Sequence, residues 1–186
     1  IQKWQKKDQI LVWHPFTQMK EWEEEPPTIM IEGKGVRLID IEGKQYLDGT
    51  SSLWVNIHGH NHPKINEALT EQITLISHST LLGLANLPSI ILAEKLLGIA
   101  PVSKDTPEKL SKVFYSDNGS TAVEIALKMA FGFWRHRQQP RKKKFVSFVN
   151  AYHGDTIGSV SLGGIDLFHQ AYAPLLFETI QVAAPT

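Results

Sequence analysis

The 186-residue chain contains no cysteine. This absence excludes disulfide bridges, thiolate nucleophiles and cysteine-ligated zinc or iron–sulfur sites. Long hydrophobic runs are also absent: stretches such as Ile90 to Ala93 are far below the roughly 18 residues needed to span a bilayer. Lys3, Lys6, Lys7 and Asp8 break any signal-peptide pattern. We therefore expect a soluble protein without a membrane partner, located in a reducing cytoplasm.

Net charge is lacking as well. Nineteen basic and nineteen acidic side chains cancel, so no global field directs the chain to nucleic acid. The basic run 141–144 follows Pro140 and is interpreted as a solvated loop. Because 42% of the residues are hydrophobic, the composition is that of a globular protein with enough apolar material for a sizeable core. Function must reside in specific sites.

The order of predicted elements indicates an α/β protein in three parts. Residues 1–62 form a small α+β segment with an antiparallel meander, 63–111 a helical connection, and 112–186 the first, incomplete part of a large, mostly parallel α/β domain. The expected strands are 28–32, 36–41, 45–48, 113–115, 145–149 and 179–182, and the expected helices are 63–77, 87–99 and 123–137. The chain starts without methionine and ends at Thr186 directly after a strand-like run. We expect it to be part of a longer polypeptide.

The segment 116–124 lies between a predicted strand and a predicted helix. Thr121 and Glu124 have the spacing of a capping box. With Gly119 and Ser120 at its start, the helix can hold a phosphate through backbone N–H groups, the serine hydroxyl and the helix dipole. An ordinary helix cap is the alternative. Nucleotide P-loop and dinucleotide glycine patterns are absent, so any phosphate here belongs to a different ligand.

A second candidate segment, 150–156, follows the strand predicted at 145–149. Ligands of open α/β sheets lie beyond the carboxyl ends of the strands, so this segment and the Gly119-Ser120 turn can border one crevice. Tyr152 could stack on a flat heterocycle or be a tyrosine at the edge of the core. Both interpretations are open from these residues alone.

Three alternating histidines, His58, His60 and His62, raise the question of a metal site. Metal ligands must converge from a fixed framework. Gly59 and Pro63 instead indicate a turn into the following helix. We predict no metal site.

Together, the segments 116–120 and 152–156 resemble the phosphate-binding and ring-stacking motifs of the class III aminotransferases, which have the fold of type I pyridoxal-phosphate-dependent transferases. The resemblance covers essentially the whole chain. It implies pyridoxal 5'-phosphate as cofactor, held at its phosphate by Gly119 and Ser120. It further implies that Tyr152 covers the ring and reaches the substrate side, with His153 beside the ring.

Two further stretches, 13–19 and 48–63, together with His78 to Thr80, are similar to the branch of that family that aminates 8-amino-7-oxononanoate to 7,8-diaminononanoate in biotin synthesis. This resemblance implies that Phe16 and Trp54 contact substrate, that the amino donor is S-adenosylmethionine or lysine, and that the enzyme is a homodimer. Some members have two adjacent tryptophans where this chain has Leu53-Trp54. That difference leaves the pocket shape and the donor open.

The resemblance assigns no catalytic residue to this chain, because the lysine that forms the Schiff base and the acidic partner of the pyridine nitrogen are expected after residue 186. Two alternatives remain. One is another class III aminotransferase, acting on an ω-amino acid. The other is a non-catalytic α/β ligand-binding module.

Overall fold

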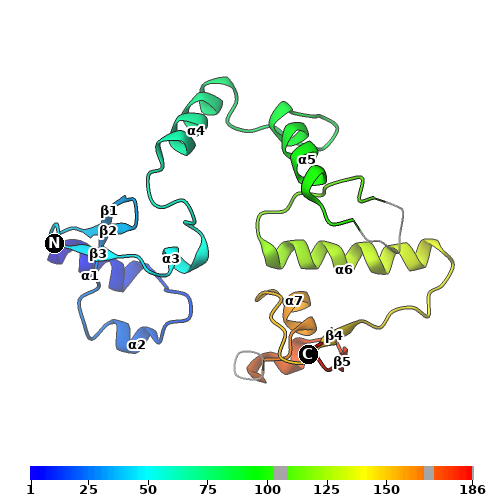
Figure 1. Cartoon of the computed structure of the whole chain (residues 1–186). Coiled ribbons are helices and arrows are strands. Elements are labelled where there is room, and N and C mark those ends of the chain that lie inside the picture. The colour runs from blue at the N-terminus through cyan, green and yellow to red at the C-terminus, as the bar shows by residue number, and fades with distance from the viewer. Residues whose placement is uncertain (103–108, 166–169, 186) are drawn as a thin grey trace. The chain divides into compact units, whose positions relative to one another are not determined.

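The structure, a computed structural model, describes residues 1–102, 109–165 and 170–185. It divides into two compact units, Ile1–Asn86 and Leu87–Thr186, whose elements are labelled in Figure 1. The first unit contains α1 (Gln2–Leu11), α2 (Met19–Trp22), β1 (Met30–Lys34), β2 (Arg37–Asp40), β3 (Gln45–Leu47), α3 (Ser51–Trp54) and α4 (Pro63–Leu75). The second contains α5 (Leu87–Ile99), α6 (Gly119–His136), β4 (Val146–Phe148), α7 (Ile157–Leu162), the 3₁₀ helix η1 (Gln170–Leu175) and β5 (Ile180–Val182). The predicted three-part division at residues 62 and 111 stays a prediction.

The first unit is built on an antiparallel sheet of order β1-β2-β3, in agreement with the expected meander. Lys34 pairs with Arg37 across the first turn. Gly35 has φ +55° there, a conformation that only glycine adopts without a steric cost. The tight turn keeps the ends of β1 and β2 close together. His60, which follows the sheet in the sequence, forms backbone hydrogen bonds with Gly35 of this hairpin.

Asp40 fixes the second turn of the sheet. Its Oδ1 accepts hydrogen bonds from the backbone N–H groups of Glu42 and Lys44, both at 2.9 Å, and its Oδ2 accepts one from the Tyr46 hydroxyl at 2.8 Å. Burial alone would raise the pKa of Asp40, but these hydrogen bonds outweigh it and hold the pKa below its ordinary value. The turn is thus closed around an ionised carboxylate that is 3% exposed.

The helix α1 was not predicted. Its amides contact the following segment: Gln5 Nε2 donates to Pro27 O at 3.2 Å and Gln9 Nε2 to Glu25 O at 3.1 Å. A hollow lies between the helix and the sheet. It is lined by Trp4 and Leu11 of α1, by Ile31 of β1 and by three apolar residues that adjoin these elements, Val12, Ile29 and Ile41.

Two helices agree closely with the sequence. α4 begins at Pro63, where a missing N–H leaves no intrahelical bond unmade, and ends at Leu75, two residues before the predicted end. α5 has the predicted bounds. Within the described residues, no helix combines the length and the apolar character that crossing a membrane requires.

In the second unit, β4 and β5 pair in parallel, Val146 with Ile180 and Phe148 with Val182. Parallel neighbours require a crossover connection, and this one contains α7, which packs against α6 and β4. Val160 of α7 is 6% exposed and Ser159 is fully buried, so α7 marks the best-enclosed part of this unit. The expected parallel sheet is therefore present in two of its three predicted strands, those at 145–149 and 179–182.

One predicted strand is wrong. Val113 to Tyr115 has no strand assignment, although its residue types favour one. A strand exists only when another strand pairs with its backbone, and none of the described segments does so here. Tyr115 is instead anchored by its hydroxyl, which donates to the carbonyl oxygen of Ser89 at 2.6 Å.

The Asp40 turn generates a pH-dependent prediction. Because the pKa of Asp40 is lowered by folding, its contribution is complete above the unfolded value of about 3.9 and is lost as the pH falls through the folded value. Asp40→Asn should therefore lower the thermal midpoint at pH 7, and the difference from wild type should shrink as the pH approaches 3. Thermal unfolding followed by circular dichroism measures this.

The matched control is Glu42→Gln, an exposed carboxylate in the same turn. It should leave the midpoint unchanged at both pH values. A difference between Asp40→Asn and wild type that stays constant from pH 7 to 3 would contradict the role of the ionised carboxylate.

Candidate functional site

The helix α6 begins at Gly119, four residues before its predicted start. Its N-cap is Asn118, whose Oδ1 accepts from the backbone N–H of Thr121 at 3.0 Å. The Asn118 N–H donates to the Thr121 hydroxyl oxygen at 3.2 Å. The capping box is therefore Asn118 with Thr121, and the predicted box of Thr121 with Glu124 is wrong. Asparagine satisfies the helix start one turn earlier than the threonine would.

This cap leaves the mouth of the helix to Gly119 and Ser120. The first N–H groups of an α-helix have no intrahelical partner, and here they belong to these two residues. The Thr121 hydroxyl donates to Asp117 Oδ1 at 2.6 Å, and this hydrogen bond holds the pKa of Asp117 below its ordinary value. The Asp117 carboxylate, which precedes the helix, is thus engaged by a side chain, while the amides of Gly119 and Ser120 lie at the positive end of an 18-residue helix.

The segment 150–156 lies against this helix mouth. The backbone N–H of Asp155 donates to Ser120 Oγ at 3.2 Å. Gly154 has φ +118°, and a Cβ at this position would come within 2.0 Å of Ser120 Oγ. Only glycine allows so close an approach. The structure therefore brings together the predicted pair Gly119 and Ser120 with the segment that carries Tyr152 and His153.

Tyr152 is 53% exposed, and its hydroxyl donates to Asp155 Oδ2. That hydrogen bond, with partial burial and the charge of Asp155, raises the pKa of Tyr152 above its ordinary value. The phenol stays neutral at physiological pH, and about half of the residue's surface remains exposed. His153, next in the chain, is half-buried.

Glu124 holds this arrangement in place. Its Oε1 accepts from the Thr156 hydroxyl at 2.6 Å and from the backbone N–H of Gly158 at 2.7 Å. The bond from Thr156 and those from the α7 amides lower the pKa of Glu124, although burial opposes the shift. A Cβ on Gly158 would come within 2.3 Å of the carboxylate. Glu124 of α6 therefore caps the N-terminus of α7.

Sequence reasoning missed this role of Glu124. The available sequence signal lay at the start of α7, Thr156-Ile157-Gly158. Because the first turn of this helix contains no acidic residue, a carboxylate from elsewhere in the chain can accept hydrogen bonds from its first N–H groups. The carboxylate comes from 32 residues earlier in the chain.

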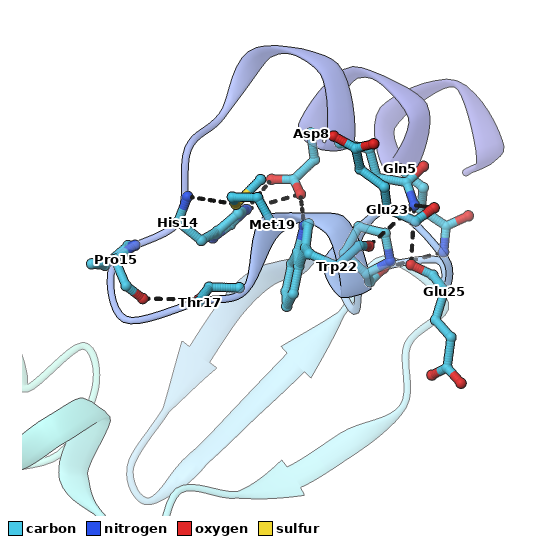
Figure 2. A network of polar contacts seen from close by, with 11 residues as sticks. Gln5, Asp8, His14, Pro15, Thr17, Met19, Trp22, Glu23 and Glu25 are labelled. Carbon is cyan, nitrogen blue, oxygen red and sulfur yellow. Dashed lines mark hydrogen bonds and ion pairs between the residues drawn. The ribbon is translucent and has the colours of Figure 1, made fainter. Parts of the chain in front are cut away.

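Phe16 lies in the first unit, in the loop between α1 and α2, with φ +50°. Figure 2 shows Asp8 between His14 and Trp22: its Oδ2 accepts hydrogen bonds from His14 Nε2 and Trp22 Nε1, each 3.0 Å long. The His14 and Trp22 rings lie 4.3 Å apart. Burial raises the pKa of Asp8, but the hydrogen bonds from Trp22 and His14 leave it below its ordinary value. Both ends of the loop are thus tied to one carboxylate, and Phe16 is 82% exposed.

Trp54 also belongs to the first unit, in α3, and is 77% exposed. Of the three histidines that follow, His60 contacts Asp48 at 2.8 Å, and His58 and His62 have ring centroids 6.0 Å apart. In the ranges that the structure describes, no three histidine, aspartate or glutamate side chains gather as metal ligands.

The family model of aminotransferase class III matches residues 18–186. This chain belongs to the class III aminotransferases. The adenosylmethionine-8-amino-7-oxononanoate aminotransferase of Geobacter sulfurreducens is 58% identical over 178 residues, which are 96% of this chain and 38% of that protein. This chain therefore spans about two fifths of the length of such relatives.

Solved structures agree with this family. The adenosylmethionine-8-amino-7-oxononanoate aminotransferase of Methanocaldococcus jannaschii matches with a TM-score of 0.90 and 47% identity, over 99% of this chain and 41% of that one. The omega transaminase of Pseudomonas jessenii in complex with PMP matches with a TM-score of 0.87 and 32% identity, over 97% and 39%. The fold is thus that of pyridoxal-phosphate-dependent class III transaminases.

The Glu124 contacts generate a stability prediction. Glu124→Ala removes the carboxylate that accepts hydrogen bonds at the α7 start, and leaving such donors without a partner costs about 2 kcal/mol. We expect that loss in the free energy of unfolding by urea. Hydrogen exchange at the amides of Gly158 and Ser159 should accelerate at the same time.

Glu94→Ala in α5 is the control, because Glu94 is an exposed helical glutamate in the same unit. It should change neither quantity. Unchanged protection of the Gly158 and Ser159 amides in Glu124→Ala would show that the carboxylate does not hold α7.

Proposed function

We propose that the protein containing this chain is a pyridoxal-phosphate-dependent aminotransferase that converts 8-amino-7-oxononanoate to 7,8-diaminononanoate in biotin synthesis. The observation that carries the proposal is the 58% identity to a relative named for this reaction. That name also supports S-adenosylmethionine as amino donor, with lysine as the alternative. We further propose that it works in the cytoplasm as a homodimer.

The start of α6 fits the cofactor's phosphate. Gly119 and Ser120 offer backbone N–H groups at the positive end of the helix dipole, and Ser120 adds its hydroxyl. Gly154 presents no side chain to Ser120 Oγ. We assign phosphate binding to Gly119 and Ser120. The neighbouring carboxylate, Asp155, accepts a hydrogen bond from the Tyr152 hydroxyl. It therefore repels the phosphate less than a carboxylate without such a donor would.

Tyr152 is proposed to cover the cofactor ring, and His153 to lie beside it. The partly exposed ring of Tyr152 is proposed to supply stacking, worth about 1 kcal/mol beyond area burial, and its hydroxyl, which donates its proton to Asp155, can still accept a hydrogen bond on the substrate side. Pyridoxal phosphate, when bound, supplies the electron sink that transamination requires. The residues of this chain bind and orient it.

Phe16 and Trp54 are proposed to contact the substrate. Both are aromatic and largely exposed, and both lie in short segments fixed by hydrogen bonds to an aspartate, Asp8 for the first and Asp48 for the second. Rigid aromatic side chains give large contact area at a low entropic cost. Some family members have a second tryptophan at the position of Leu53. With leucine there, this part of the proposed pocket has less aromatic surface.

A second candidate function is transamination of an ω-amino acid, favoured by the match to the omega transaminase of Pseudomonas jessenii. The cofactor cradle serves both reactions. A non-catalytic ligand-binding module would retain the cradle and lack the lysine that carries the cofactor.

Ser120→Ala tests the cradle. Loss of a hydrogen bond to a charged phosphate costs about 1.5–3 kcal/mol, so the dissociation constant of pyridoxal phosphate should rise about 10- to 150-fold. Titration of the apoenzyme with the cofactor, followed by fluorescence, measures it. Ser111→Ala removes an exposed hydroxyl outside segment 116–120 and should leave the affinity unchanged; equal affinity in the two variants would refute the assignment.

The reaction itself is tested on the full-length protein with two substrates, 8-amino-7-oxononanoate and an ω-amino acid. We expect turnover of the first with S-adenosylmethionine or lysine as donor. After borohydride reduction, mass spectrometry should find the cofactor on a lysine outside residues 1–186. Turnover of the ω-amino acid alone would favour the second candidate, absence of any labelled lysine the binding module, and a labelled lysine within residues 1–186 would contradict the assignment of no catalytic residue to this chain.

A further inference from the structure

The short element that carries Trp54 has an unusual backbone. All four residues of α3 have positive φ: +52° at Ser51, +48° at Ser52, +63° at Leu53 and +72° at Trp54. Trp54 N–H donates to the carbonyl oxygen of Thr50 at 2.8 Å, so the segment is a closed left-handed turn. Each L-residue in this conformation brings its Cβ too close to the following carbonyl oxygen. Because none of the four is glycine, contacts outside the turn must hold it.

Asp48 provides these contacts. Its Oδ1 accepts from the Ser52 N–H at 2.9 Å, and its Oδ2 accepts from the Ser52 hydroxyl and from His60 Nε2, both at 2.8 Å. The side chains of Asp48 and His60 are 7% and 14% exposed. The bonds from the Ser52 backbone and side chain, followed by that from His60, lower the pKa of Asp48. The ionised Asp48 carboxylate therefore holds Ser52, in the first half of the turn, by hydrogen bonds.

The β1–β2 hairpin fixes the Asp48–His60 pair in turn. The backbones of His60 and Gly35 exchange two hydrogen bonds, 2.7 and 3.1 Å long, and the Asp48 N–H donates to the carbonyl oxygen of Val36 at 2.9 Å. Gly33 lies so close that an added Cβ would meet the His60 ring at 2.7 Å. Both members of the pair are thus attached to one rigid turn of the sheet.

We propose that the Asp48–His60 pair positions Trp54: by holding residues 51–54 in a left-handed turn, it sets the direction of the indole and thereby which ketone substrate fits. Asp48 and His60 act through Trp54 and touch no substrate themselves. The part concerning substrate fit rests on the proposed function, in which Trp54 contacts the substrate. The conformational part does not depend on it.

The conformational part is tested by 19F NMR on the full-length, cofactor-loaded protein labelled with 5-fluorotryptophan. Trp54→Phe assigns the Trp54 resonance. Asp48→Asn keeps the side chain's size but replaces one acceptor oxygen by a donor, and His60→Gln removes the ring. Both should shift or broaden the Trp54 resonance and leave those of Trp4 and Trp22 in place.

The matched controls for these variants are His58→Gln and Glu42→Gln, which change exposed side chains of the same unit. They should leave the Trp54 resonance unchanged. An unchanged Trp54 resonance in both Asp48→Asn and His60→Gln would overturn the proposal, whatever the enzyme's substrate.

A second pair of variants tests the left-handed turn while Asp48 and His60 stay intact. If Asp48→Asn does not fold, this pair decides the question. Asparagine tolerates the left-handed conformation, whereas a β-branched residue is an outlier there. Leu53→Asn should therefore have a thermal midpoint about 2–4 °C above that of Leu53→Val and keep the wild-type Trp54 resonance. Equal midpoints and equal resonances would show that the left-handed turn does not govern Trp54.

Steady-state kinetics test the substrate part. Asp48→Asn should raise the KM for 8-amino-7-oxononanoate about tenfold or more, equivalent to at least about 1.4 kcal/mol, with kcat within about twofold and unchanged cofactor affinity. A moved Trp54 resonance with an unchanged KM would overturn the claim about substrate fit. If the wild-type enzyme does not use this ketone, the proposed function fails, and the NMR result still decides whether the pair positions Trp54.

Discussion

The arrangement of the candidate cofactor site depends on one carboxylate. Glu124 lies in the second turn of α6, and its Oε1 is 2.6 Å from the Thr156 hydroxyl and 2.7 Å from the Gly158 nitrogen. This contact places the start of α7 beside the start of α6. Segment 150–156 ends at α7, so it has to pass the mouth of α6, where Gly154 approaches Ser120. Without the carboxylate, the Asp155–Ser120 hydrogen bond and the packing of α7 on α6 would remain, but the hydrogen bonds that fix the start of α7 would be lost.

Carboxylates that accept several hydrogen bonds also fix the local geometry of the first unit. Asp8, Asp40 and Asp48 each accept two or more hydrogen bonds from neighbouring segments, and the pKa of each is lowered. Apolar burial within the described residues is slight, since Val160, 6% exposed, is the one large hydrophobic residue among them that is buried. Hydrogen bonds to carboxylates are directional and about twice as strong as neutral ones. They can therefore define local geometry where apolar packing within this span does not.

Periodicity and turn residues were sufficient for much of this fold. Apolar spacing predicted α4 and α5, and the glycines at 35 and 43 separated the strands of the meander. Patterns failed where structure depends on a distant partner. Val113 to Tyr115 has strand-forming residues and no strand beside it, and the partners of Glu124 lie more than thirty positions away. In the site, the rule for strand ends predicted that Ser120 and segment 150–156 lie together, and they do, although the strand expected before Ser120 is not formed. The contact at Gly154 was not predicted.

The left-handed turn at 51–54 shows why some structural features cannot be predicted from the local sequence. Ser-Ser-Leu-Trp contains no residue that favours positive φ, and the conformation costs about 1–2 kcal/mol per residue. Glycine would remove that cost, but a glycine at 54 would also remove the indole. An exposed aromatic ring and a left-handed backbone can occur at one position only if other groups hold the backbone. Here these groups are Asp48 and His60, which are themselves attached to the β1–β2 hairpin, so the direction of Trp54 is determined by a sheet whose nearest strand residue, Leu47, lies seven positions earlier in the chain.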